Sequence, residues 1–267
     1  MIYLLLALSP VIFYLRMFWG FFQQDEWLGY SQYILHKGQN FGELLAYFFT
    51  ASIGHFTPFT IATVHGLFAL LNLNYMSYVM LSLSLHLVTG ILVFVLAKNL
   101  FKNSKQAALT VFLFGIFASS FQGTAWVIAD LAGHLSGIFG LLAIIYTLKS
   151  NTFKTLLFLI ISLLFKEITI GLFLLIPIMI YIFNLKMKIK PVLVVLVVYI
   201  FLRGLMAFAP NQVKDTTVFA TQSMPKIIYN FVTVPFKSIS QSIIPQGQIR
   251  WVSEILTKSL GEKIAGE

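Results

Sequence analysis

Two acidic residues stand side by side where the first apolar run of the chain ends. Asp25 and Glu26 follow the run Met1–Phe22, which only Arg16 interrupts. A carboxylate at the boundary between membrane and water could act as a general base toward a polar substrate. Capping of a helix, which Asp does well, is the structural alternative. Because adjacent residues do not share a helix face, we expect only one of the pair to point into a site.

Further ionisable residues interrupt or border the later apolar runs: His55, Asp130, His134, Lys166, Glu167 and Arg203. Such groups are costly at membrane depth, by about 3 kcal/mol each, so their gathering suggests a polar site. Asp130 and His134 are four residues apart and share a helix face, which could orient a base, satisfy a buried acid or contribute to a metal site. Lys166 and Arg203 could hold a phosphate, although Lys166 and Glu167 could also form a buried ion pair.

The composition is that of a membrane protein. Hydrophobic residues make up 58% of the chain and charged residues only 10%, against about 25% charged residues in soluble domains. The net charge of +9 does not indicate nucleic-acid binding, because the lysines cluster at the ends of apolar runs, as the positive-inside rule requires. The absence of cysteine excludes disulfides and thiol chemistry.

The lysine clusters predict the topology. If every cluster is cytoplasmic, each apolar stretch between two clusters crosses the membrane an even number of times. The stretch before Lys149 then turns near Ser119–Gly123, and the next one turns at Lys166-Glu167. The arm before Lys166 has about 14 residues, roughly 21 Å, so Lys166 and Glu167 should lie below the outer surface. The predicted spans are Met1–Phe22, Tyr75–Leu100, 106–120, 124–148, the two arms around Lys166-Glu167, and Pro191–Ala209.

We therefore expect an all-α polytopic membrane protein with about seven transmembrane helices in one unit, residues 1–209. Its first loop, residues 23–74, would lie outside the cytoplasm and carry short interfacial helices. Residues 210–267 would form an extracytoplasmic or interfacial tail, and this chain would be a fragment of a longer protein. The location would be the cell membrane, with the polar site facing outside the cytoplasm.

The order of these segments resembles the GT-C membrane glycosyltransferases, in particular the O-mannosyltransferase-like branch. The resemblance covers residues 1 to about 205. Thr57 and Ile128 depart from it, because an Arg is common at both positions in that pattern. The matching segments are Gln24-Asp25-Glu26-Trp27, Thr57-Pro58-Phe59, Leu71-Asn72-Leu73-Asn74, Leu85-His86, Thr124–Asp130, Leu164–Thr169 and Tyr199–Arg203.

The resemblance implies inverting transfer of a sugar from a polyprenyl-phosphate donor to a hydroxyl of a glycan, lipid or protein acceptor. Asp25 would be the base, assisted by Glu26, and Lys166 and Arg203 would hold the donor phosphate. The remaining site residues, Asp130, Glu167, His55 and His134, would support substrate binding. No cofactor is implied, although a divalent metal ion would be compatible with the acidic residues. The alternatives are a lipid-linked-sugar flippase or transporter and a non-catalytic membrane subunit of cell-envelope assembly.

Overall fold

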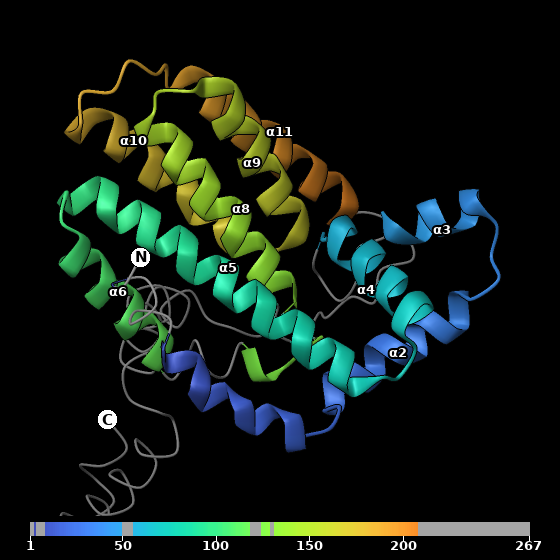
Figure 1. The fold of residues 1–267 in the computed structure, drawn as a ribbon. Coiled ribbons are helices and arrows are strands. Elements are labelled where there is room, and N and C mark those ends of the chain that lie inside the picture. The colour runs from blue at the N-terminus through green and yellow to red at the C-terminus, as the bar shows by residue number, and fades with distance from the viewer. Residues whose placement is uncertain (1–2, 4–8, 50–55, 118–123, 129–130, 208–267) are drawn as a thin grey trace, which may run out of the picture.

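A computed structural model describes residues 3, 9–49, 56–117, 124–128 and 131–207. This part of the chain is all-helical and contains no strand, which confirms the all-α part of the predicted fold class. The helices are arranged as a bundle with a smaller group of helices at one end (Figure 1). The elements are η1 (Ser9–Trp19), α2 (Gln24–His36), α3 (Phe41–Phe48), α4 (Pro58–Leu71), α5 (Tyr75–Phe101), α6 (Ser104–Ile116), α8 (Leu131–Leu148), α9 (Thr152–Phe165), η2 (Glu167–Gly171), α10 (Leu172–Ile182) and α11 (Lys190–Ala207).

Two of the described helices are long and apolar enough to cross a membrane. Helix α5 has 27 residues with a mean hydropathy of 2.4, and α8 has 18 residues with a mean hydropathy of 1.8. Helix α5 matches the span predicted at Tyr75–Leu100. Of the run predicted as the first span, residues 3 and 9–22 are described, and the helix that they contain is η1, an 11-residue 3₁₀ helix.

The lysine-rich turns lie at one end of the bundle. The α5–α6, α8–α9 and α10–α11 connections are at the upper left of Figure 1, whereas α2, α3 and α4 are on the right. Local geometry fixes two of these turns. Lys102 ends α5 in the left-handed conformation with φ 55°, and the side chain of Asn103 then accepts a hydrogen bond from the Lys105 N–H. Asn151 caps α9 in the same way, through the Lys154 N–H.

The helix predicted at 124–148 is shorter than expected, since α8 begins only at Leu131. In a continuous helix the Ile128 N–H would donate to the Thr124 carbonyl. Here Ser82 Oγ donates to the Thr124 carbonyl at 2.7 Å, and the Ile128 N–H donates to Glu26 Oε1 at 2.9 Å. The Ile128 N–H is therefore used by a side chain of α2 and not by the Thr124 carbonyl, and the helix is interrupted there.

The predicted break at Lys166-Glu167 is confirmed. Helix α9 has 14 residues and ends at Phe165, and Lys166 is extended, with φ −157° and ψ 134°. The chain then reverses through η2 into α10 (Figure 1).

Small polar residues join α8 to α9. Ser162 Oγ donates to the Ser136 carbonyl at 2.7 Å, and Ser136 Oγ is 3.0 Å from the Ser162 carbonyl. One turn further along α8, a Cβ added at Gly140 would lie 3.3 Å from Leu172 and from Thr169. Small residues at such contacts let helix backbones approach closely, as is common between membrane helices.

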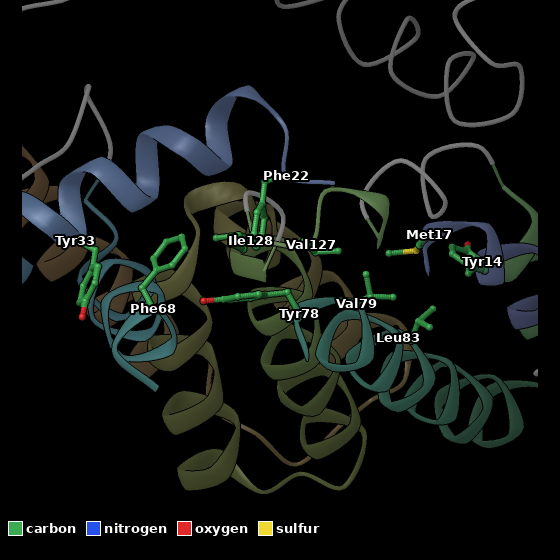
Figure 2. Close-up of a cluster of buried hydrophobic side chains, with 10 residues drawn as sticks. All are labelled: Tyr14, Met17, Phe22, Tyr33, Phe68, Tyr78, Val79, Leu83, Val127 and Ile128. Carbon is green, nitrogen blue, oxygen red and sulfur yellow. The ribbon is translucent and has the colours of Figure 1, made fainter. Parts of the chain in front are cut away.

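A buried cluster holds the small helices against the bundle. Figure 2 shows that its side chains come from η1, α2, α4, α5 and the 124–128 segment. Tyr14, Phe68 and Tyr78 are fully buried in it, and Phe22 makes edge contacts with the Tyr75 and Tyr78 rings. This core groups Phe22, two residues before α2, with Val127 and Ile128.

Candidate functional site

Glu26 is a buried carboxylate that joins α2 to the segment before α8. Its side chain is 2% exposed. Oε2 accepts a hydrogen bond from the Gln23 N–H at 2.6 Å, and Oε1 accepts one from the Ile128 N–H at 2.9 Å. These bonds give Glu26 a positioning role, whatever else it does. It fixes the first turn of α2, where Asp25 lies, against Ile128, two residues before Asp130 in the sequence.

Glu167 joins three separate segments at the break between α9 and α10. Its Oε1 accepts the Phe56 N–H at 2.9 Å and lies 3.1 Å from Arg203 Nε. Arg203 belongs to α11, and Phe56 stands just before α4. The Arg203 side chain is 34% exposed and that of Glu167 is 20% exposed, so the pair remains accessible.

Lys166 lies beside the first turns of α8. Ser136 Oγ donates to its carbonyl at 3.1 Å, and Thr169 Oγ1 donates to the same carbonyl at 3.2 Å. The break between α9 and α10, which carries Lys166 and Glu167, is therefore brought next to Arg203 of α11. The sequence interpretation assigned all three residues to substrate binding.

His134 occupies the first turn of α8 and meets His86 of α5. Their ring centroids are 6.2 Å apart, and His86 Nδ1 is 3.1 Å from Thr124 Oγ1. This hydrogen bond joins α5 to the segment before α8. Among the described residues, the buried His134 Nε2 has no hydrogen-bond partner. Asp130, its predicted i−4 neighbour, and His55 lie outside the described residues.

Sequence reasoning missed several polar residues of this region. Ser82 shares one face of α5 with His86 at i,i+4 spacing, a signal that could have identified it. Thr124 is fully buried and is hydrogen-bonded at two atoms, its carbonyl oxygen and its hydroxyl, yet nothing in its own sequence surroundings indicates this. Tyr199 lies one turn before Arg203 on α11, and its hydroxyl is buried.

A divalent metal site was given as one possibility by the sequence analysis. Within the residues that the structure describes, no three His, Cys, Asp or Glu side chains gather as a metal site would require. Because Asp130 and His55 lie outside that part of the chain, binding of a divalent ion stays a prediction.

The candidate site thus has two parts. One is the Glu26–Ile128 contact at the start of α2, and the other is the Lys166–Glu167–Arg203 cluster beside the first turns of α8. Comparison of the chain with protein-family models, curated proteins and solved structures finds no match.

Proposed function

We propose that this protein is a multi-pass membrane glycosyltransferase of the GT-C type. It would transfer a sugar from a polyprenyl-phosphate donor to an acceptor hydroxyl at the outer face of the membrane. The observation that carries the proposal is the junction of Glu167, Arg203 and the Phe56 N–H beside Lys166. This junction combines two cations with a carboxylate that orients one of them. It lies where α9 ends, and that end of α9 points away from the lysine-rich turns (Figure 1).

The orientation follows from charge. The α5–α6, α8–α9 and α10–α11 turns carry the lysine clusters, which the positive-inside rule assigns to the cytoplasm. Seven segments then cross the bilayer: the one containing η1, followed by α5, α6, α8, α9, α10 and α11. In this orientation α2, α3 and α4 lie on the outer side, and Asp25 meets acceptors there.

The reaction is a single displacement. The acceptor hydroxyl gives its proton to the Asp25 carboxylate while its oxygen bonds to the anomeric carbon. The bond from that carbon to the phosphate oxygen breaks on the opposite face, which inverts the configuration. The phosphate leaves with the electron pair, and Lys166 and Arg203 stabilise its charge. Glu167 orients Arg203, and Glu26 holds the first turn of α2 in place.

Release of polyprenyl phosphate tests the proposal. Purified protein is incubated with a panel of polyprenyl-phosphate sugars and a membrane-extract acceptor pool, with EDTA or with Mg²⁺ or Mn²⁺. Loss of a general base costs about 10²–10⁴-fold in rate, so Asp25→Asn should fall by at least about 100-fold. Glu43→Gln, which alters an exposed carboxylate of the same loop, should keep the wild-type rate. Absence of release from every donor, or equal release by wild type and Asp25→Asn, would refute this assignment.

A further inference from the structure

The α8–α9 turn brings two lysine ammonium groups to one aromatic ring. Lys149 Nζ lies 5.2 Å from the centre of the Tyr146 ring, and Lys154 Nζ lies 4.9 Å from the same centre. The two ammonium groups are therefore no more than about 10 Å apart. The face of a tyrosine ring attracts a cation, so the ring holds both lysines in place.

The turn that carries this pair is fixed by its own contacts. Ser150 has φ 54°, and its N–H donates to the Thr147 carbonyl at 2.8 Å. The hydroxyls of Thr147 and Thr155, both fully buried, are 3.4 Å apart. The Tyr146 ring stacks on Phe158 of α9, with ring centroids 5.4 Å apart. The ring and the two lysines therefore stand on a frame that exists before any ligand binds.

No carboxylate balances the two charges. Residues 146–155 contain neither Asp nor Glu, and both lysine side chains are exposed. The part of the chain that the structure describes gives neither lysine an acidic partner. The α5–α6 and α10–α11 turns, which lie at the same end of the bundle (Figure 1), also lack acidic residues. Two like charges held this close repel each other, so an anion placed between them is favoured.

Exposed apolar residues beside the pair indicate the class of anion. Phe153 directly precedes Lys154 and is 74% exposed, and Leu157, one turn further along α9, is 41% exposed. At the α5–α6 turn, Phe101 precedes Lys102 and is also exposed. Exposed aromatic rings next to lysines are typical of the level at which bilayer hydrocarbon meets the head groups. An anion at Lys154 therefore has an apolar helix surface beside it, which fits a lipid better than a soluble phosphate.

We infer that Lys149, Lys154 and Tyr146 form a binding site for the phosphate of an anionic phospholipid. The two ammonium groups contact the phosphate oxygens, and the Tyr146 ring keeps them in position. An acyl chain of the lipid lies against Phe153 and Leu157. This site is independent of the proposed function, since it shares no residue with the candidate functional site and lies at the lysine-rich end of the bundle.

Binding of phosphatidylglycerol to the purified protein in a neutral detergent tests the site, with phosphatidylcholine as the uncharged comparison. Native mass spectrometry measures both affinities, and wild type should bind phosphatidylglycerol at least about tenfold more tightly. The double variant Lys149→Gln/Lys154→Gln should weaken phosphatidylglycerol binding about 20-fold and leave phosphatidylcholine binding unchanged. Lys102→Gln/Lys105→Gln is the matched control, because it removes the same charge from exposed lysines of the α5–α6 turn; it should bind within about threefold of wild type.

Substitutions of Tyr146 separate the arrangement of the lysines from their charge. Tyr146→Leu keeps both ammonium groups but removes the ring, and should weaken phosphatidylglycerol binding about fivefold. Tyr146→Phe keeps an aromatic face and should bind as wild type does. If Tyr146→Leu does not fold, the two lysine variants and Tyr146→Phe decide the matter.

Equal weakening by the two double variants would overturn the inference, because the lysines would then act only through net charge. Equal affinity of wild type for phosphatidylglycerol and phosphatidylcholine would overturn it too. So would displacement of phosphatidylglycerol by an equal concentration of inorganic phosphate, since the acyl chain would then contribute nothing. Release of polyprenyl phosphate is measured separately and decides the proposed function alone.

Discussion

The hydrogen bond from the Ile128 N–H to Glu26 can be isolated by comparing two glutamates in the same setting. Glu26 and Glu43 both occupy the third position of a helix, and each accepts a hydrogen bond from the backbone N–H three residues earlier. A glutamine can replace glutamate in this capping arrangement. Glu43 is exposed, whereas Glu26 is buried and also accepts the Ile128 N–H. The substitutions Glu26→Gln and Glu43→Gln therefore differ mainly in that one tertiary contact.

The expected loss for Glu26→Gln is about 2 kcal/mol. A hydrogen bond to a charged group contributes about 1.5–3 kcal/mol, and a glutamine that keeps the Gln23 bond turns its NH₂ toward the Ile128 N–H. Glu43→Gln should change stability by less than about 0.5 kcal/mol. Since 1.4 kcal/mol is a factor of ten, the local opening equilibrium around Ile128 should rise about 30-fold in Glu26→Gln.

Hydrogen exchange measures this directly. The amides at 124–128 should exchange about 30-fold faster in Glu26→Gln than in wild type, and at the wild-type rate in Glu43→Gln. If both variants leave the exchange of this segment unchanged, the Glu26–Ile128 bond does not hold α2 to the bundle, and the explanation of the helix break at 124–128 is wrong.

Three further predictions concern packing, pH and ion pairing. A Cβ at Gly115 would lie 2.9 Å from the Pro10 ring, so Gly115→Ala should lower the free energy of unfolding by about 1–3 kcal/mol. A Cβ at Gly137 would have nothing within 4 Å, so Gly137→Ala should raise the free energy of unfolding by up to about 1 kcal/mol. Burial and, to a smaller extent, the charge of His36 lower the pKa of His65. The folded state therefore favours neutral His65. The free energy of unfolding should not be reduced by this residue above about pH 6.5, and it should fall as the pH drops below that value. Melting curves from pH 8 to pH 5 should show this fall, and His65→Phe should reduce it. Arg203→Lys cannot reproduce the Nε contact with Glu167 and should slow the release of polyprenyl phosphate several-fold; an unchanged rate would refute a phosphate-binding role for Arg203.

The parts of the fold that local patterns determine could be predicted from the sequence. The apolar run at Tyr75–Leu100 and the lysines after it identified α5 almost to the residue. The break at Lys166-Glu167 was also predictable, because a charged pair inside an apolar run cannot remain in one long span without cost. In both cases the controlling residues are neighbours in the sequence.

The interruption at 124–128 could not be predicted, because its causes are distant in the sequence. Glu26 is 102 residues from Ile128, and Ser82 is 42 residues from Thr124. The same limit applies to the site. Glu167 and Arg203 were both identified as candidates, but their direct pairing depends on how α11 packs beside α9. The burial of the Tyr199 hydroxyl depends on that packing too.

The side of the membrane on which each end of the bundle lies is the most direct test of the account. Because the chain has no cysteine, single-cysteine variants can be labelled in intact cells with a membrane-impermeant maleimide. Ser31→Cys lies on α2, and Lys105→Cys and Lys188→Cys lie at the lysine-rich turns; all three positions are exposed. The account predicts labelling of Ser31→Cys alone in intact cells, and labelling of all three after permeabilisation. Labelling of the Lys105→Cys and Lys188→Cys variants in intact cells, with Ser31→Cys protected, would contradict an outward-facing site.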